Sequence, residues 1–117
     1  MTKITLYLLK SEFYDDGVGE ELFYCPKCLV VEGFWAVFPR ARQNLNIQYV
    51  EFERPRGDMA NSVGDSQSCP QLVFPKGDDS HSVGLSKPGV STVRRIEDVD
   101  DILAYLITRF DLPRPYP

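Results

Sequence analysis

The Cys25-Pro26-Lys27-Cys28 motif is followed by a segment that is apolar almost throughout, as far as residue 38. The segment is longer than a typical buried strand, and Pro26 suits the first helical turn, where its missing N–H costs no hydrogen bond. Pro39 cannot continue a hydrogen-bond ladder, so we expect the helix to end or bend before it. The two cysteines are therefore predicted to lie on the first turn of a buried helix.

Short segments typical of strands recur along the chain. Residues 4–9, 47–52 and 71–74 are apolar or alternating and rich in β-favouring side chains, so each is predicted to be a strand. A strand, a helix and a strand in that order imply a right-handed crossover and a parallel pair. Residues 11–21 are expected to form a loop, and residues 59–67 a short helix. A fourth strand is expected to begin near Ser82 or Val83, with a turn at Lys87-Pro88-Gly89.

The last helix has the clearest pattern in the chain. Apolar side chains recur at helical spacing between residues 99 and 110, acidic residues crowd the first turn, and Pro113 and Pro115 follow. The predicted order is β-α-β-α-β-β-α. We therefore expect an α/β fold with a four-stranded mixed sheet flanked by helices, formed as a single domain over residues 1–117.

Charge and hydropathy exclude several classes of protein. Thirteen basic and seventeen acidic residues leave a net charge of −4, which offers no general attraction for nucleic acid. No apolar run approaches the length of a membrane-spanning helix, and the apolar stretch in the first ten residues is too short for a signal peptide and is followed by no small-residue cleavage site. The cytoplasm is the expected location. Disulfide staples are rare there, so three cysteines are better explained as reactive or metal-binding groups.

The C-x-x-C spacing predicts thiol chemistry. Unpaired N–H groups at a helix N-terminus stabilise a thiolate, so Cys25 is the candidate attacking thiol, with Lys27 adding positive potential. Cys28, one turn further on, is the candidate resolving thiol. The alternative is half of a metal site, for which Cys69 and His81 would have to supply the remaining ligands.

A second motif is Cys69-Pro70, directly before the predicted strand at residues 71–74. Proline at a strand entry belongs at the first residue or in a special turn, and only an X–Pro bond adopts cis at low cost. A trans bond would be the default for this dipeptide alone. Together with the upstream C-x-x-C motif, it favours a cis bond.

These motifs resemble a known superfamily. Tyr24-Cys25-Pro26-Lys27-Cys28 is similar to the C-P-x-C motif of glutaredoxins, and the segment from Cys69 to residue 74 to their proline-led strand. More narrowly, Phe23, Glu32-Gly33 and Arg54-Pro55-Arg56 are among the matches to a bacterial thioredoxin-like family of unknown function. The resemblance implies a thioredoxin-like fold in which the turn at Pro70 packs against the dithiol. The backbone at Cys69 and Pro70 would then pair with an incoming substrate.

Several other residues carry open alternatives. Cys69 is a small buried hydrophobe, an alternative disulfide partner, or a ligand of zinc or an iron–sulfur cluster. Glu32, on the helix face of Cys28, is either a paired surface residue or the acceptor of the Cys28 proton. Arg54 and Arg56 either guide an anionic substrate or belong to a solvated loop.

Two functions follow from these motifs. The first is a thiol–disulfide oxidoreductase that needs no cofactor and acts on protein disulfides or glutathione-type thiols, using Cys25, Cys28, Cys69 and Pro70. The second is a non-catalytic module, whose cysteines hold a metal or an iron–sulfur cluster or whose fold serves as a binding platform.

Overall fold

A computed structural model describes residues 4–78, 82 and 84–117, which fold around a five-stranded mixed sheet of order β4-β1-β5-β7-β6. Strand β1 pairs with β4 in parallel and with β5 in antiparallel register. Strand β7 pairs in antiparallel register with both β5 and β6. The strands span β1 Thr5–Leu9, β4 Asn46–Val50, β5 Gln71–Val73, β6 Lys87–Pro88 and β7 Arg94–Ile96. The α/β class predicted from the sequence is confirmed.

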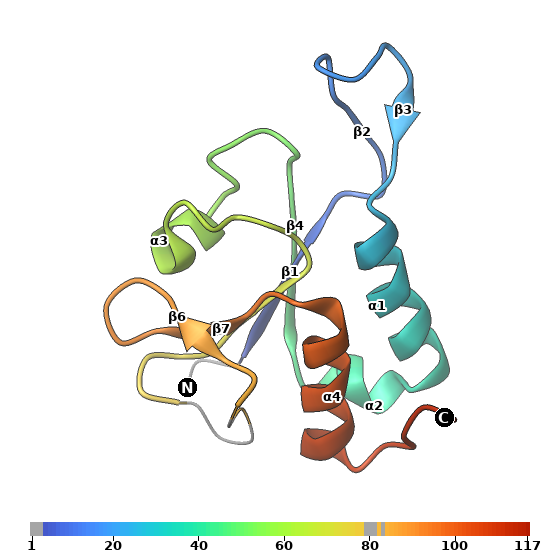
Figure 1. Cartoon of the computed structure of the whole chain (residues 1–117), viewed down its shortest axis with the longest axis vertical. Helices are drawn as coiled ribbons and strands as arrows, with labels where there is room; N and C mark the ends of the chain where they lie inside the picture. The colour runs from blue at the N-terminus through green and yellow to red at the C-terminus, as the bar shows by residue number, and fades with distance from the viewer. Residues whose placement is uncertain (1–3, 79–81, 83) are drawn as a thin grey trace.

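Helices cover both faces of the sheet (Figure 1). On one side α1 (Pro26–Val37), α2 (Pro39–Gln43) and α4 (Val99–Phe110) pack against one another, while the short α3 (Met59–Val63) lies on the other side. Every residue of β1 is buried, as expected for a central strand covered on both faces. No helix among the described residues is long and apolar enough to cross a membrane.

The ends of the two long helices follow from their sequences. Asp98 caps α4, because its Oδ1 accepts hydrogen bonds from the backbone N–H groups of Asp100 and Asp101 at 2.9 and 3.2 Å. α1 begins at Pro26 and ends at Val37, two residues before Pro39, as predicted. Each helix buries an apolar stripe in the hydrophobic core, formed by Val31 and Trp35 of α1 and by Ile102, Tyr105 and Leu106 of α4.

The sequence prediction was wrong at one edge of the sheet. Over the residues that the structure describes, the main sheet has five strands instead of four, and Lys87–Pro88, expected to be a turn, forms strand β6. Ser82 lies outside any strand, and Val83 lies outside the described residues. Strand β7, which pairs with β6, was missed because it contains the charged residue Arg95. Arg95 is buried, and it donates hydrogen bonds to the side chains of Gln71 and Glu97 and to the Pro88 carbonyl. A strand of this composition does not stand out by hydrophobicity.

The predicted loop between β1 and α1 contains an unpredicted hairpin. Strands β2 (Phe13–Tyr14) and β3 (Leu22–Phe23) pair in antiparallel register, with Phe13 opposite Phe23 and Tyr14 opposite Leu22. The hairpin projects beyond the sheet and returns the chain to the N-terminus of α1 (Figure 1). It therefore leads directly into the Cys25 motif.

Candidate functional site at the N-terminus of α1

Cys25 is the N-cap residue of α1, as the sequence predicted. Its backbone is extended (φ −86°, ψ 111°), and its Sγ accepts a hydrogen bond from the backbone N–H of Cys28 at 3.2 Å. Cys25 remains partly accessible to solvent. The sulfur therefore lies at the positive end of the helix, within hydrogen-bonding distance of a backbone N–H of the first turn.

Cys28 lies one turn further into α1 and is buried. Burial raises the pKa of its thiol well above the ordinary value, and the hydrogen bond and charge of the neighbouring Cys25 raise it further. The two thiols of the motif thus differ in environment: one is accessible and caps the helix, whereas the other is enclosed and holds its proton at neutral pH.

The turn at Cys69 and Pro70 lies against this helix end. The Cys69–Pro70 peptide bond is cis, as predicted, and Pro70 is buried at the entry to β5. The Cys25 thiol donates a hydrogen bond to the Cys69 carbonyl oxygen, with 3.7 Å between Sγ and O. The structure therefore brings together all four site residues that the sequence singled out, and all three cysteines are free thiols.

The side chain of Cys69 is also partly enclosed. Burial raises the pKa of the Cys69 thiol to about 11, although the positive charge and hydrogen bond of Arg56 partly counteract this rise. Cys69 packs against the hydrophobic core. At neutral pH it is a protonated, largely apolar side chain.

Arg56 does not belong to a solvated loop, one of the two alternatives that the sequence left open. It is 7% exposed, and its Nε and one Nη donate to the backbone carbonyls of Phe52 and Gln67, each at 2.8 Å. Its backbone N–H donates to Oε1 of Gln67 at 2.7 Å. These bonds fasten the segment that leads into Cys69, so Arg56 positions the turn. Arg54, by contrast, is exposed.

A cavity of about 220 Å³ opens beside the dithiol. It is lined by Leu9, Lys10, Ser11, Tyr24, Cys25, Cys28, Leu29 and Glu32. Tyr24 and Leu29, which the sequence prediction did not include in the site, are about 59% and 58% exposed. The sequence signal that could have identified them is their position, because Tyr24 directly precedes Cys25 and Leu29 directly follows Cys28. The cavity gives a small group access to both thiols.

Glu32 is the carboxylate of this cavity. It accepts hydrogen bonds from Trp35 Nε1 at 2.9 Å and from the Tyr49 hydroxyl at 2.9 Å. Burial raises the pKa of Tyr49, and the adjacent Glu32 raises it further, so the hydroxyl remains a donor. Glu32 is thus a paired residue, one of the two predicted alternatives, and its carboxylate is held in a fixed position beside the cavity.

The described part of the chain contains no cluster of three or more His, Cys, Asp or Glu side chains arranged to hold a metal ion. His81, the proposed fourth ligand of the alternative metal site, lies outside the described residues.

Comparison with known proteins gives a family but no activity. Residues 3–114 match the model of DUF3088, a family of proteins of unknown function, so the chain belongs to this family. No curated protein and no solved structure is significantly similar to the chain.

Proposed function

We propose that this member of DUF3088 is a thiol–disulfide oxidoreductase of thioredoxin-like architecture that acts in the cytoplasm. The observation that carries the proposal is the position of the Cys25 sulfur. It caps α1, with the Cys28 N–H at 3.2 Å and the Cys69 carbonyl at 3.7 Å, and it lines an open cavity. A sulfur at a helix N-terminus with access for a reactant is the arrangement that nucleophilic thiol chemistry requires.

The reaction begins with attack of the Cys25 thiolate on one sulfur of a substrate disulfide. An S–S bond forms between Cys25 and the substrate, the substrate S–S bond breaks, and the released thiolate takes up a proton. Cys28 then loses its proton and attacks Sγ of Cys25, which releases the second substrate thiol. The substrate gains two electrons, and the enzyme is left with a Cys25–Cys28 disulfide. Two molecules of a small thiol such as glutathione, or one dithiol, then reduce the Cys25–Cys28 disulfide and are themselves oxidised to a disulfide.

Cys69 and Pro70 contribute through the backbone. The Cys69 carbonyl accepts a hydrogen bond from the Cys25 thiol in the reduced state. Once Cys25 is a thiolate it no longer donates, and the carbonyl is free to accept a backbone N–H of a polypeptide substrate. Arg56 keeps this carbonyl in place through its bonds to Phe52 and Gln67.

Glu32 supplies a base for the second step. Cys28 holds its proton tightly because it is buried, so its attack requires an acceptor. Cys28 and Glu32 line the same cavity, and the carboxylate is oriented by Trp35 and Tyr49. A water molecule in the cavity carries the proton from the thiol to the carboxylate.

Trapping of the mixed disulfide tests the proposal. The Cys28→Ser variant, mixed with a peptide disulfide, should accumulate a covalent adduct on Cys25 that intact-mass spectrometry detects and dithiothreitol removes. The matched Cys25→Ser variant should give no adduct. Elemental analysis of the same preparation provides a second check. Absence of the adduct, or about one equivalent of zinc or iron that is lost in Cys69→Ser, would contradict the proposal.

A further inference from the structure

The hairpin formed by β2 and β3 has two different faces. Residues directly opposite each other in an antiparallel pair lie on the same face, so Phe13 and Phe23 share one face and Tyr14 and Leu22 the other. The Phe13 ring stacks on the Phe52 ring, with centroids 4.6 Å apart and planes inclined by 4°. One face of the hairpin is thus packed on the body of the protein.

The same stack joins the hairpin to the Cys69 turn. The guanidinium of Arg56 lies 5.1 Å from the centroid of the Phe52 ring, and it bonds to the Gln67 carbonyl two residues before Cys69. The hairpin is therefore positioned relative to the dithiol by contacts on the side of Phe52 as well as by its connection to Cys25.

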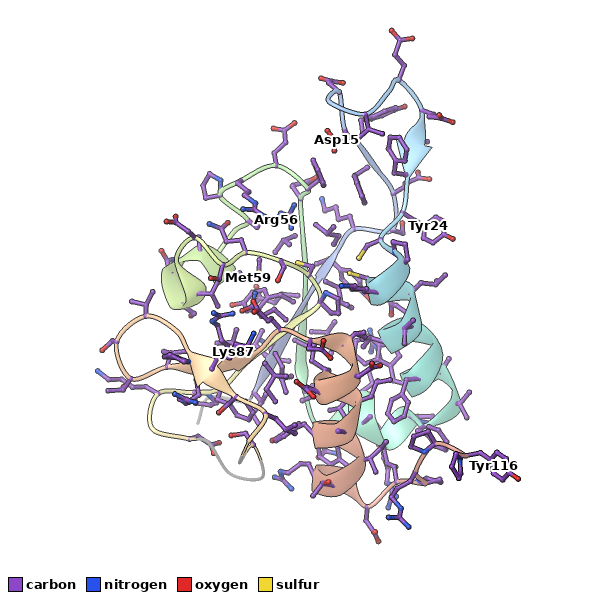
Figure 2. The ribbon with its side chains drawn as sticks, viewed as in Figure 1. Asp15, Tyr24, Arg56, Met59, Lys87 and Tyr116 are labelled. Carbon is purple, nitrogen blue, oxygen red and sulfur yellow. The ribbon has the colours of Figure 1, made fainter. Side chains whose placement is uncertain are left out.

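The other face of the hairpin carries two large exposed side chains, and two more lie beside the dithiol. Tyr14 is 60% exposed and Leu22 is 49% exposed. Tyr24 follows two residues later, and Figure 2 shows it at the base of the hairpin beside the N-terminus of α1. Tyr24 and Leu29 line the dithiol cavity. Large side chains exposed both on a projecting hairpin and beside a reactive cysteine are typical of an interaction surface.

The charge of the hairpin indicates the kind of partner. Residues 12–23 contain five acidic side chains and no basic one: Glu12, Asp15, Asp16, Glu20 and Glu21. All except Asp15 are exposed, and Asp15 organises the tip through a hydrogen bond from the Gly17 N–H at 3.0 Å (Figure 2). Just before the hairpin, Lys10 is already paired with Glu51. A cationic partner is therefore electrostatically complementary to this surface.

We propose that the hairpin is a docking arm for a basic, extended segment of polypeptide that carries the disulfide reduced at Cys25. This inference rests on the proposed oxidoreductase function and names its substrate class. A polypeptide can contact the arm and Cys25 together, and its lysine or arginine side chains can lie over Tyr14 and Tyr24 as well as near the carboxylates. Glutathione is a small anion, so it gains nothing from the arm.

A second copy of this chain is a poorer occupant of the same surface. Its net charge is −4, and a symmetric contact would bring two acidic hairpins together.

The test uses the Cys28→Ser protein and two short peptides, each with one cysteine activated as a mixed disulfide with thiopyridine. The peptides differ only in flanking residues, lysine in one and glutamate in the other. For each peptide, the rate at which the protein releases thiopyridone is divided by the rate at which mercaptoethanol releases it. The ratio then no longer depends on the intrinsic reactivity of the peptide disulfide. We expect the basic peptide to react about tenfold faster at low salt, and this preference to vanish in 1 M salt.

Paired charge variants locate the effect. Glu20→Lys with Glu21→Lys should abolish or reverse the preference for the basic peptide. Asp65→Lys with Asp100→Lys changes the net charge by the same amount at exposed positions outside the hairpin, and should keep the preference. Tyr14→Ser with Leu22→Ser should slow both peptides by at least about fivefold, the loss typical of truncated contact residues. Circular dichroism of each variant establishes that it is folded.

The outcomes separate the two proposals. If the neutral disulfide 2,2′-dithiodipyridine modifies Cys25 but the two peptides react at equal normalised rates, the docking arm is wrong and the oxidoreductase function stands. A preference that both charge pairs change equally also overturns the arm, because it would then reflect net charge alone. Concentration-dependent dimerisation that is lost in the Tyr14→Ser, Leu22→Ser variant would assign the surface to a second copy. If Cys25 reacts with none of these disulfides, both proposals fail.

Discussion

The Cys25 sulfur lies 3.7 Å from the carbonyl oxygen of Cys69, although 44 positions separate the two residues in the chain. The sheet produces this contact. Strand β1 runs antiparallel to β5 with Tyr7 opposite Gln71, so the C-terminus of β1 and the N-terminus of β5 lie at the same end of the strands. The hairpin after β1 returns the chain to α1 at this end. Cys25 and Cys69 are thus brought together by strand register.

The buried position of Cys28 predicts how the second step depends on pH. Because burial raises the pKa of this thiol, almost none of it is a thiolate between pH 6 and 8, and its attack depends on the Glu32 carboxylate as proton acceptor. Decay of the mixed disulfide should therefore change by less than about threefold over this range, whereas in Glu32→Gln, where the thiol must first lose its proton to solvent, it should rise about tenfold per pH unit. Rapid-quench measurements of mixed-disulfide decay compare the two proteins, and a tenfold rise per pH unit in the unmodified chain would show that Glu32 is not the acceptor.

Replacement of Glu32 tests the proton acceptor. Glu32→Gln retains a side-chain oxygen for Trp35 and Tyr49 but removes the negative charge. We expect decay of the mixed disulfide to slow by about 100-fold, the lower range for loss of a general base, and to slow far more than the first attack does. Tyr49→Phe, which keeps the carboxylate but removes one donor, serves as the matched control and should have a smaller effect.

Arg56 should matter for stability, whereas its neighbour Arg54 should not. Arg56→Met keeps a long side chain but leaves the Phe52 and Gln67 carbonyls without their charged donor, a loss of about 2–4 kcal/mol in the free energy of unfolding. The pKa of Cys69 should also rise, because Arg56 lowers it in the native protein. Arg54→Met changes an exposed residue and should alter the free energy by less than about 0.5 kcal/mol. Urea unfolding and thiol titration measure the two effects.

Much of the fold was predictable because its main elements are locally encoded. The apolar stripe and the acidic first turn of α4 arise within twelve residues, and Asp98 supplies the cap. The long apolar run after Pro26 similarly specifies α1. The site residues were identified from the same kind of local signal, a cysteine pair before a helix and a proline before a strand, and the expectation that the two motifs meet came from their resemblance to those of glutaredoxins.

The features that were missed depend on partners far away in the sequence. Buried Arg95 is tolerated in β7 only because Gln71 and Glu97 satisfy it, and buried Arg56 requires the Gln67 carbonyl. Strands of two residues are also too short for a periodic signal. The hairpin did leave a trace, since paired apolar residues at 13–14 and 22–23 flank the Asp-Gly turn signal.

Alkaline pH should destabilise the reduced protein partly through Cys69. The pKa of this thiol is about 11 in the folded chain, against about 8.5 for an unfolded cysteine. Between these values the unfolded chain loses the proton while the folded chain retains it, so the free energy of unfolding falls as pH rises. Relative to Cys69→Ser, which does not titrate, the native protein should lose about 2 kcal/mol between pH 8 and 11, after allowance for solvent screening at this partly accessible site. Urea unfolding in a phosphine reductant measures both proteins, and parallel stability curves would show that the Cys69 thiol titrates alike in the folded and unfolded chains.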